Sequence, residues 1–353
     1  MSLFKKKSFG LEISDNAVKV AELSGKPMAA RLDAYGASQL DIGVVDNGGI
    51  FDKKKLAEGI AQAIEKASPG AIDTEDFIFA LPESKVFIQF FEIPNNVDSV
   101  SDAIRVKASE VVPIDFANLV DDYMPVLEGE EANEYLYVAA QKDVLTSFFE
   151  VFEQVGIEPY AVEFESAAMV RALFDTCPEN HASLLVDIGA RTTIVSIYDY
   201  CSIVFSKNIQ IAGNTFTKHL SEGLKVSMKD AEQLKIKSGL DPKTKKGKSA
   251  TLLKSPIDEI IAEISQVLSF YKGKTDRPIK EMILCGGSSR LKQLPEYMHD
   301  TLGIPVKVGL PLSKIKTKKG SKKAILSPTV IGLALRSLEK KPDEAGINLL
   351  ANL

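Results

Sequence analysis

The sequence has 353 residues and a formal net charge of −5, with 45% hydrophobic and 26% charged residues. The length allows two domains, each with its own core, and the composition is ordinary for a soluble globular protein. The acidic balance argues against binding nucleic acid through overall charge. The basic N-terminal residues precede no apolar run, so we expect neither a signal peptide nor an anchor there, and any work at a membrane would depend on a partner.

Three cysteines, Cys177, Cys201 and Cys285, lie far apart in the sequence and are odd in number. There is no CxxC motif and no Cys/His cluster, so we expect neither a disulfide framework nor a metal site built on cysteine. The expected compartment is therefore reducing, which favours the cytoplasm.

The first elements are predicted to form a β-β-β-α-β unit. Residues 9–23 alternate apolar and polar side chains around a short turn at Ser14, Asp15 and Asn16, which predicts a hairpin. Asp52 is a candidate N-cap for the helix of this unit. After the hairpin, the expected elements are a strand at 29–42, a helix at 52–67 and a strand at 77–81.

Residues 83–156 are predicted to form an insertion with its own small α/β pattern. Phe148, Phe149 and Phe152 follow helical spacing, and we expect them to pack in the core rather than to line a ligand site. The expected elements are strands at 86–93, 121–127 and 134–140 and helices at 99–112 and 142–154. A strand at 156–164 and a helix at 165–174 follow.

The stretch LLVDIGARTTIVSIYDY at 184–200 predicts a second hairpin. A turn containing Gly189 would let backbone N–H groups approach an anion closely. Asp187, at the end of the first strand, is suited to hold a divalent cation, usually through water. The pattern predicts a phosphate and magnesium site, and the alternative is an ordinary hairpin with an acid at its tip.

The two hairpins align with each other at an offset of 175 residues, so that Glu12 falls on Asp187 and Ser14 on Gly189. This correspondence indicates two halves, each opening with a hairpin whose turn could face a shared cleft.

The C-terminal half contains a third turn of this kind, because a strand at 282–285 runs directly into Gly286 and Gly287. The lysine-rich stretch 313–323 is expected to be an exposed loop, with contact to anionic lipid or an acidic partner as the alternative. The other expected elements are a strand at 202–211, a helix from 215, and helices at 230–237, 256–271, 291–302 and 328–340.

Three such turns, spread over two similar halves, resemble the actin, sugar-kinase and DnaK-type ATPases. MILCGGSSRLKQL (282–294) is similar to the adenosine motif of that superfamily, and ESAAM (165–169) is similar to its connecting helix. Within the superfamily, the chain resembles the PilM family of type IV pilus assembly proteins, relatives of the division protein FtsA. Four segments carry this resemblance: GLEISDNAVKVAEL, VDIGARTT, AEQLK and SPTVIGLALR.

The resemblance implies an α/β fold, namely a two-lobed actin-like (ribonuclease H-like) ATPase fold with an FtsA/PilM-type inserted subdomain. The implied parts are a first lobe at 1–82 and 157–181, the inserted subdomain at 83–156, a second-lobe core at 182–220 and 275–340, a second-lobe helical subdomain at 221–274, and a tail at 341–353.

The resemblance also implies an ATP and Mg²⁺ site. Asp187 would hold Mg²⁺, directly or through water, and Glu165 would position the attacking water because catalysis of phosphoryl transfer is mainly positioning. Glu12 is the matching acid of the first loop. Residues implied to contact the phosphates are Ser14, Asp15, Asn16, Lys19, Gly189, Ala190, Arg191, Thr192 and Gly213. Residues implied to contact the ribose and base are Glu232, Lys235, Gly286, Gly287, Ser288 and Arg290.

The first loop departs from the family pattern. It has Glu12 where relatives usually have Asp, and Ser14 where they usually have Gly. A side chain at position 14 restricts positive φ. We therefore expect nucleotide binding with weak or absent hydrolysis, partly offset by a charge-assisted bond from Arg191.

The resemblance implies a cytoplasmic ATP-binding scaffold, peripheral to the membrane, that binds the N-terminal peptide of a PilN-like bitopic membrane protein near the inserted subdomain. One alternative is an FtsA-like cytoskeletal protein, although Pro342 and Gly346 interrupt the tail where FtsA has an amphipathic helix. The other is a small-molecule kinase, for which the sequence offers no convincing general base.

The tail contains Ile347, Asn348, Leu349 and Leu350, and PilN-type partners begin with a similar segment. We hypothesise that this tail occupies the peptide groove of its own or a neighbouring molecule. The alternative is a frayed end without function.

Overall fold

The computed structural model describes residues 7–243, 247–311, 315–316 and 327–351. It divides into two compact units, and each is described by itself. Unit 1 comprises Met1–Cys177, Tyr200–Phe205 and Pro311–Leu353, and unit 2 comprises Pro178–Asp199 and Ser206–Leu310. The sequence-based prediction placed residues 200–205 and 275–340 in the second lobe and residues 178–181 in the first. The division by contacts instead groups residues 200–205, 311, 315–316 and 327–340 with unit 1 and residues 178–181 with unit 2.

Helix α9 (Pro328–Arg336) shows why this part of the chain belongs to unit 1. All nine of its residues are buried, and it packs on strands of the unit 1 sheet and on helix α4 (Glu165–Leu173). The contact is close, because a Cβ added to Gly332 would lie 1.8 Å from the carbonyl oxygen of Ala168. The helix is also shorter than predicted, since it ends at Arg336 rather than at residue 340.

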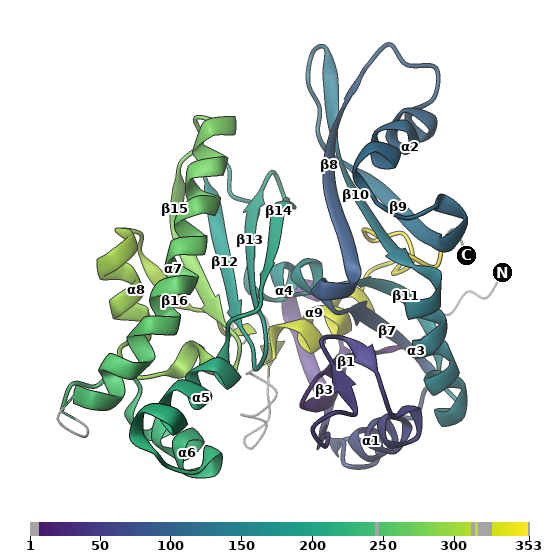
Figure 1. Ribbon diagram of the computed structural model, residues 1–353. Helices are drawn as coiled ribbons and strands as arrows, with labels where there is room; N and C mark the ends of the chain where they lie inside the picture. Colours follow the sequence, from purple (N-terminus) through teal and green to yellow (C-terminus); the bar gives the residue numbers. More distant parts are fainter. Residues whose placement is uncertain (1–6, 244–246, 312–314, 317–326, 352–353) are drawn as a thin grey trace. The chain divides into compact units, whose positions relative to one another are not determined.

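The main sheet of unit 1 has the strand order β11-β7-β1-β2-β3-β17, and β6 pairs with β3. Strand β1 runs antiparallel to β2 and parallel to β7, which in turn is parallel to β11 (Figure 1). The bounds are β1 Phe9–Ser14, β2 Ala17–Ser24, β3 Ala30–Gln39, β6 Ser68–Pro69, β7 Asp76–Leu81, β11 Glu158–Phe164 and β17 Ile315–Lys316.

Two layers of helices cover this sheet. Phe148 and Phe152 of α3 (Lys142–Val155) pack on Phe77 and Phe79 of β7, which confirms their prediction as core residues. Helix α1 (Lys53–Glu65) lies beside α3, and Asp52 caps it by accepting from the Lys55 N–H at 3.0 Å. Helices α4 and α9 cover the opposite face.

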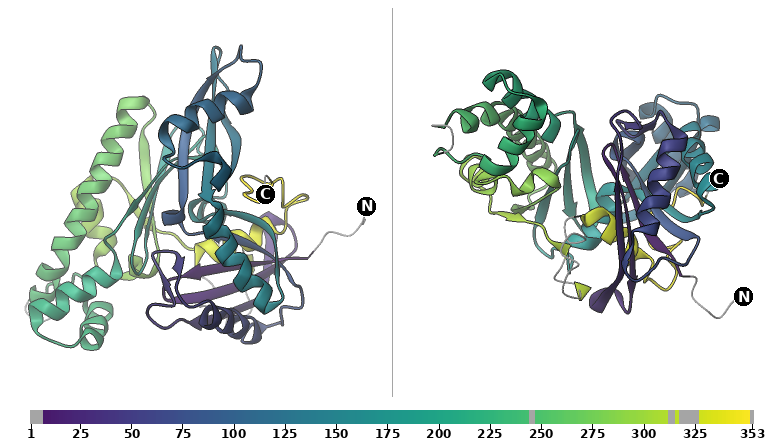
Figure 2. Two further views of the ribbon diagram at one scale, coloured as in Figure 1. Left: turned by 45° about the vertical axis from the view of Figure 1, so that its right-hand side comes forward. Right: turned by 90° about the horizontal axis from the view of Figure 1, so that it is seen from below.

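Within the insertion predicted at 83–156, residues 86–141 form a subdomain around a three-stranded antiparallel sheet with the order β8-β10-β9. The predicted range extends too far, because α3 packs on β7 of the main sheet instead. Ile104 and Ala108 of α2 pack on Phe91 and Ile93 of this sheet, which gives the subdomain its own core. Figure 2 shows helix α2, in blue, lying against the sheet. Its elements are β8 Val86–Pro94, α2 Val100–Val111, β9 Leu119–Leu127 and β10 Ala132–Gln141.

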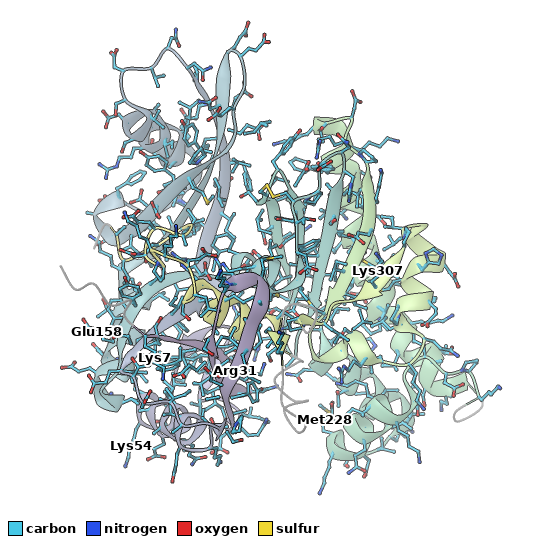
Figure 3. The ribbon with its side chains drawn as sticks, turned by 180° about the vertical axis from the view of Figure 1, so that it is seen from behind. Lys7, Arg31, Lys54, Glu158, Met228 and Lys307 are labelled. Atoms are coloured by element: carbon cyan, nitrogen blue, oxygen red, sulfur yellow. A yellow bond between two sulfur atoms is a disulfide. The ribbon has the colours of Figure 1, made fainter. Side chains whose placement is uncertain are left out.

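Unit 2 repeats the strand order of unit 1. Its sheet has the order β14-β13-β12-β15-β16, with β12 antiparallel to β13 and parallel to β15. The first four residues of β14, 202–205, are grouped with unit 1 by their contacts. This order corresponds strand by strand to β3-β2-β1-β7-β11, which gives the sequence repeat a structural basis. The strands are β12 Ala182–Ile188, β13 Thr193–Asp199, β14 Ser202–Ile209, β15 Ile279–Cys285 and β16 Val306–Val308. Lys307 of the edge strand β16 pairs with Glu281 of β15 at 2.8 Å (Figure 3).

The helices of unit 2 are α5 (Gly213–Leu224), α6 (Met228–Ser238), α7 (Lys248–Lys274) and α8 (Leu294–Leu302). Helix α7 is longer than predicted. Because proline favours the first turn of a helix, the sequence suggests a start at Pro256. The structure instead begins the helix at Lys248 and buries Pro256 in its interior.

One further expectation is wrong, because Cys177 and Cys201 form a disulfide (Figure 3). Their Cα atoms lie 4.8 Å apart, a proximity that a separation of 24 residues does not reveal. The cysteine-based argument for a reducing compartment therefore no longer holds. The lysine-rich stretch 313–323 lies outside the described residues except for Ile315 and Lys316. Among the described residues, no helix is both long and apolar enough to cross a membrane.

Candidate functional site

The candidate site of unit 2 lies at the carboxyl ends of β12 and β15. These two parallel strands are neighbours, and Asp187 of β12 pairs in register with Cys285 of β15. Gly286 and Gly287 follow Cys285 directly. Ligands of open α/β sheets bind outside the carboxyl ends of parallel strands, so the fold brings two of the predicted stretches to a favourable edge.

Gly286, directly after β15, allows the backbone to pass close to the end of β12. Its φ is +83°, and an added Cβ would lie 2.3 Å from Asp187 Oδ1 and 2.5 Å from the carbonyl oxygen of Ile188. Both the backbone conformation and the close approach therefore require glycine. The half-buried Asp187 carboxylate is held against the glycine turn.

Cys285 contributes a contact that the sequence analysis missed. Its side chain is buried and interacts with the Asp187 carboxylate. Burial raises the pKa of Cys285 well above its ordinary value, and the charge of Asp187 and a hydrogen bond to it raise the pKa further. The sulfur is therefore a neutral thiol beside Asp187 at neutral pH.

The turn at 189–192 is tied to the start of α5. The Gly189 N–H donates to Thr192 O at 3.0 Å, and the N–H groups of Gly213 and Asn214 donate to the carbonyls of Gly189 and Ala190. Gly189 does not have a positive φ, and a Cβ there would lie 3.1 Å from Thr192 O. The glycine at 189 thus serves a close approach rather than a left-handed conformation, and Arg191 is exposed on the same turn.

Gly213 is the point at which three predicted stretches meet. A Cβ added there would lie 3.0 Å from Ser288 Oγ, 3.1 Å from Gly189 O and 3.4 Å from Lys235 Nζ. The structure therefore brings the turn after β12, the turn after β15 and helix α6 together around the first residue of α5.

Lys235 and Glu232 lie one turn apart on α6 and form an ion pair of 2.7 Å. The ammonium group of Lys235 is buried and donates to Gly213 O at 2.8 Å and to Thr217 Oγ1 at 2.9 Å. Sequence analysis missed Thr217, although its spacing of four residues from Gly213 places it on the same helix face. This network fixes α6 against α5 and leaves the Glu232 side chain 45% exposed.

The stretch after Gly286 forms a short 3-10 helix, Gly287–Arg290. Ser288 is buried, whereas Gly287 and Arg290 are exposed. Ser289 closes the turn, because its hydroxyl donates to Gly286 O at 2.8 Å.

The predicted residues of the first loop lie in unit 1 and make local contacts. Ser14 Oγ donates to Ala17 O at 3.0 Å, which closes the two-residue turn of Asp15 and Asn16. Asp15 accepts from the Gly48 N–H at 3.3 Å. The Asn16 carbonyl accepts from the Leu40 N–H at 2.9 Å.

Glu12 and Lys19 form an ion pair in the same hairpin. Their side chains are 2.6 Å apart, and they are cross-strand partners in the register of β1 and β2. The second carboxylate oxygen of Glu12 accepts from the Val330 N–H in the first turn of α9 at 3.2 Å. Both oxygens of this acid therefore have donors inside unit 1.

Glu165 lies at the start of α4 and accepts from the Glu83 N–H at 2.9 Å. Glu83 is buried and reciprocates, because its carboxylate accepts from the hydroxyl of Ser166 at 2.7 Å and from the Ser166 N–H at 3.3 Å. The two acids thus join α4 to the segment after β7. Neither Glu83 nor Ser166 was predicted from sequence.

Of the two hairpins, that of unit 2 suits an anion bound together with a cation. It offers the Asp187 carboxylate, an exposed guanidinium and glycine cradles at positions 213 and 286 that a side chain would fill. Magnesium prefers carboxylate oxygens together with substrate phosphates, and glycine turns admit phosphate groups close to the backbone. The residues present therefore fit a Mg²⁺–nucleotide group.

Comparisons with known proteins agree with this fold. A family model described as "Type IV pilus assembly protein PilM" matches residues 10–338. The cell division protein FtsA of Staphylococcus epidermidis is 26% identical over 255 residues, which cover 65% of this chain and 54% of that protein. The chain thus spans about half the length of this relative.

Solved structures show the same fold at low sequence identity. A structure titled "PilM-PilN type IV pilus biogenesis complex" has a TM-score of 0.81 at 21% identity and covers 95% of this chain and 100% of that chain. MreB5 of Spiroplasma citri bound to AMPPNP has a TM-score of 0.56 at 14% identity and covers 93% of this chain and 95% of that chain. The chain therefore has an actin-like fold.

Proposed function

Because the chain belongs to the type IV pilus assembly protein PilM family, we propose that it is an actin-like nucleotide-binding scaffold of a type IV pilus or a related machine. In this proposal unit 2 binds ATP with Mg²⁺, and unit 1 binds the cytoplasmic N-terminal segment of a PilN-like bitopic membrane protein. The chain would lie in the cytoplasm, at the inner face of the membrane, and reach it only through this partner. The observation that carries the nucleotide proposal is the meeting of three predicted stretches at Gly213.

The predicted site residues of unit 2 have the following roles in this proposal. Asp187 holds Mg²⁺, directly or through water, and the cation neutralises phosphate charge. The turn at 189–192 and the start of α5 surround the phosphates, with Arg191 supplying a positive charge. Glu232, with its exposed carboxylate, accepts from the ribose, while Lys235 keeps α6 in place. The residues 286–288 and Arg290 flank the adenosine.

We further propose that hydrolysis is weak or absent. The support comes from unit 1, where both candidate catalytic acids already accept hydrogen bonds from the protein. Glu12 is held by Lys19 and the Val330 N–H, and Glu165 accepts from the Glu83 N–H. An acid bound in this way is a poor base for an attacking water, because its lone pairs are engaged and its geometry is fixed.

Three measurements test this function. Equilibrium dialysis with labelled ATP, with Mg²⁺ or with EDTA, should show binding that depends on magnesium, and a release assay should show little phosphate over hours. Calorimetry with a synthetic N-terminal segment of the PilN-like protein from the same organism should show binding. If neither ligand binds, the proposal is wrong. A cytoskeletal function, favoured by the FtsA relatives, would instead appear as ATP-dependent polymers in sedimentation.

A further inference from the structure

The segment at 346–351, called the docked segment here, lies against unit 1. Figure 1 shows this end of the chain, in yellow, beside β9 and β11. Ile347, Asn348 and Leu349 are at most 5% exposed, while Lys340, Lys341, Asp343 and Glu344 of the preceding stretch are exposed. The frayed end considered from the sequence is therefore not what the structure shows.

The docked segment covers the outer edge of the main sheet. Strand β11 ends the strand order, and its other edge pairs with β7. The Val162 carbonyl accepts from the Leu349 N–H at 2.9 Å, and the Val162 N–H donates to Asn348 Oδ1 at 3.1 Å. Asn348 thus completes the edge with its side-chain amide, as an added strand would with its carbonyl.

The inserted subdomain holds the same residue from the other side. Asp122 of β9 accepts from the Asn348 N–H at 2.7 Å. The Asn348 side chain also accepts from the Leu350 N–H at 3.2 Å, which fixes the local turn. Unit 1 therefore binds Asn348 through both its backbone and its side chain. Replacement of Asn348 by an apolar residue would leave the Val162 N–H without this acceptor.

A buried arginine, Arg336, donates hydrogen bonds to the main chain of the segment. Arg336 is 0% exposed and donates to the carbonyls of Ile347 at 2.7 Å, Gly346 at 3.4 Å and Pro342 at 2.7 Å. Its charge is balanced by Glu163 at 2.6 Å, which also binds Arg171. Without the segment this guanidinium would lose two acceptors, the carbonyls of Gly346 and Ile347, a costly loss for a buried charge.

These contacts are those of a peptide ligand. One backbone carbonyl of an edge strand, one carboxylate and one guanidinium bond the main chain of the segment, and a backbone N–H of the same edge strand bonds the Asn348 side chain. Buried positions accept two apolar side chains around this asparagine. None of them requires the segment to be covalently joined to α9, and four of the nine residues that connect the two, Lys340, Lys341, Asp343 and Glu344, are exposed.

We propose that the docked segment is a tethered occupant of a peptide-docking site on unit 1. A partner segment of the same chemistry, extended with an asparagine between two apolar residues, must displace it to bind. This inference rests on the proposed partner function and adds its regulation. A short flexible tether keeps the segment near its site at an effective concentration of about 1 mM. When the segment is docked 99% of the time, only about 1% of the sites are open, and the apparent affinity for the partner segment falls about 10²-fold.

The test uses the full chain with a specific protease site inserted between the exposed residues Lys340 and Lys341. The probe is a fluorescent peptide with the sequence of residues 343–353, followed by anisotropy before cleavage and after cleavage and removal of the released fragment. We expect the cut chain, shown to be folded by circular dichroism, to bind the probe about 10²-fold more tightly than the uncut chain. Equal binding before and after cleavage, or no binding to folded cut chain, would overturn the inference.

A second variant covers the case in which the cut chain unfolds. Asn348→Ala in the uncut chain loses the acceptor for Val162 and should bind the probe about tenfold more tightly than the unmodified chain, whereas the exposed control Ala351→Ser should bind it as the unmodified chain does. Equal binding by Asn348→Ala and the control would overturn the inference. Dimerisation of the uncut chain on probe binding would indicate exchange between copies and would also overturn it.

The same cut chain separates this inference from the proposed function. If it binds the probe but no PilN-like segment, the tethered site stands and the partner assignment fails. If a PilN-like segment binds equally well before and after cleavage, the partner assignment stands and the tethered occupant fails.

Discussion

In unit 1 the hairpin of β1 and β2 turns through two residues, Asp15 and Asn16, whereas in unit 2 the hairpin of β12 and β13 turns through four, 189–192. The two hairpins have the same neighbours, since each first strand lies between an antiparallel and a parallel strand. The longer turn approaches the start of α5, and the end of β12 just before it approaches the glycine after β15. The shorter turn is closed by Ser14 and bonded to Gly48 and Leu40.

The acids of the two hairpins differ in the same way. Glu12 faces Lys19 across its hairpin and forms an ion pair, while the equivalent partner of Asp187 is the uncharged Ile194. A repeated scaffold thus carries one acid that stabilises its own unit and one that lies beside a glycine cradle. A repeat in strand order therefore need not be a repeat in chemistry.

Gly286→Ala should have the largest effect, because it inserts a Cβ 2.3 Å from Asp187 Oδ1 at a residue with φ of +83°. We expect at least a hundredfold loss of Mg²⁺-ATP affinity by calorimetry and a loss of about 2 kcal/mol in the free energy of unfolding by urea titration. The matched control is Gly303→Ala, since this glycine also has a positive φ, of +70°, but a Cβ there meets nothing within 4 Å. Equal affinities of the two variants would mean that the cradle does not contact the nucleotide.

Lys19→Met should have an intermediate effect, seen in the free energy of unfolding. The substitution gives Glu12 an uncharged cross-strand partner, as Ile194 is for Asp187 in the second hairpin. The Glu12 carboxylate is then buried without its cation, which should cost about 1–3 kcal/mol in the free energy of unfolding. Lys54→Met, at an exposed position of α1, is the control and should change little. We expect ATP affinity to stay within about twofold, and a large loss of affinity would give the first hairpin a direct role.

Arg191→Ala should have the smallest effect. The side chain is exposed on the four-residue turn, where solvent screens its charge. We expect about tenfold weaker binding of ATP and a smaller change for ADP, since one charge-assisted contact to the terminal phosphate is removed. Lys218→Ala on the exposed face of α5 provides the control. A matching loss for both nucleotides would place Arg191 away from the terminal phosphate.

Much of this fold could be predicted from the sequence, because half-buried strands alternate and helices begin at caps such as Asp52. The ion pair of Glu12 and Lys19 was within reach too, since the two residues are placed symmetrically about the turn. The lobe to which α9 belongs could not be predicted, because all nine of its residues are buried and the sequence does not indicate which sheet they contact.

The candidate site could be predicted as a set of stretches but not as contacts. The glycine turns mark positions where backbone must approach closely, yet the contacts of Gly213 with Ser288 and Lys235 join residues far apart in sequence. The docked segment is similar, since Asp122, Val162 and Arg336 come from three separate elements. Local patterns fix which residues are unusual, and tertiary packing decides what they touch.

The most direct test of the central comparison is calorimetry with Mg²⁺-ATP on two variants, Asp187→Ala and Glu12→Gln. We predict that Asp187→Ala loses magnesium-dependent binding by at least about a hundredfold, because a carboxylate that holds the cation is removed. Glu12→Gln should bind within about twofold of the unmodified protein, since its acid is engaged within unit 1. Wild-type affinity in Asp187→Ala, or an equal loss in both variants, would contradict the account.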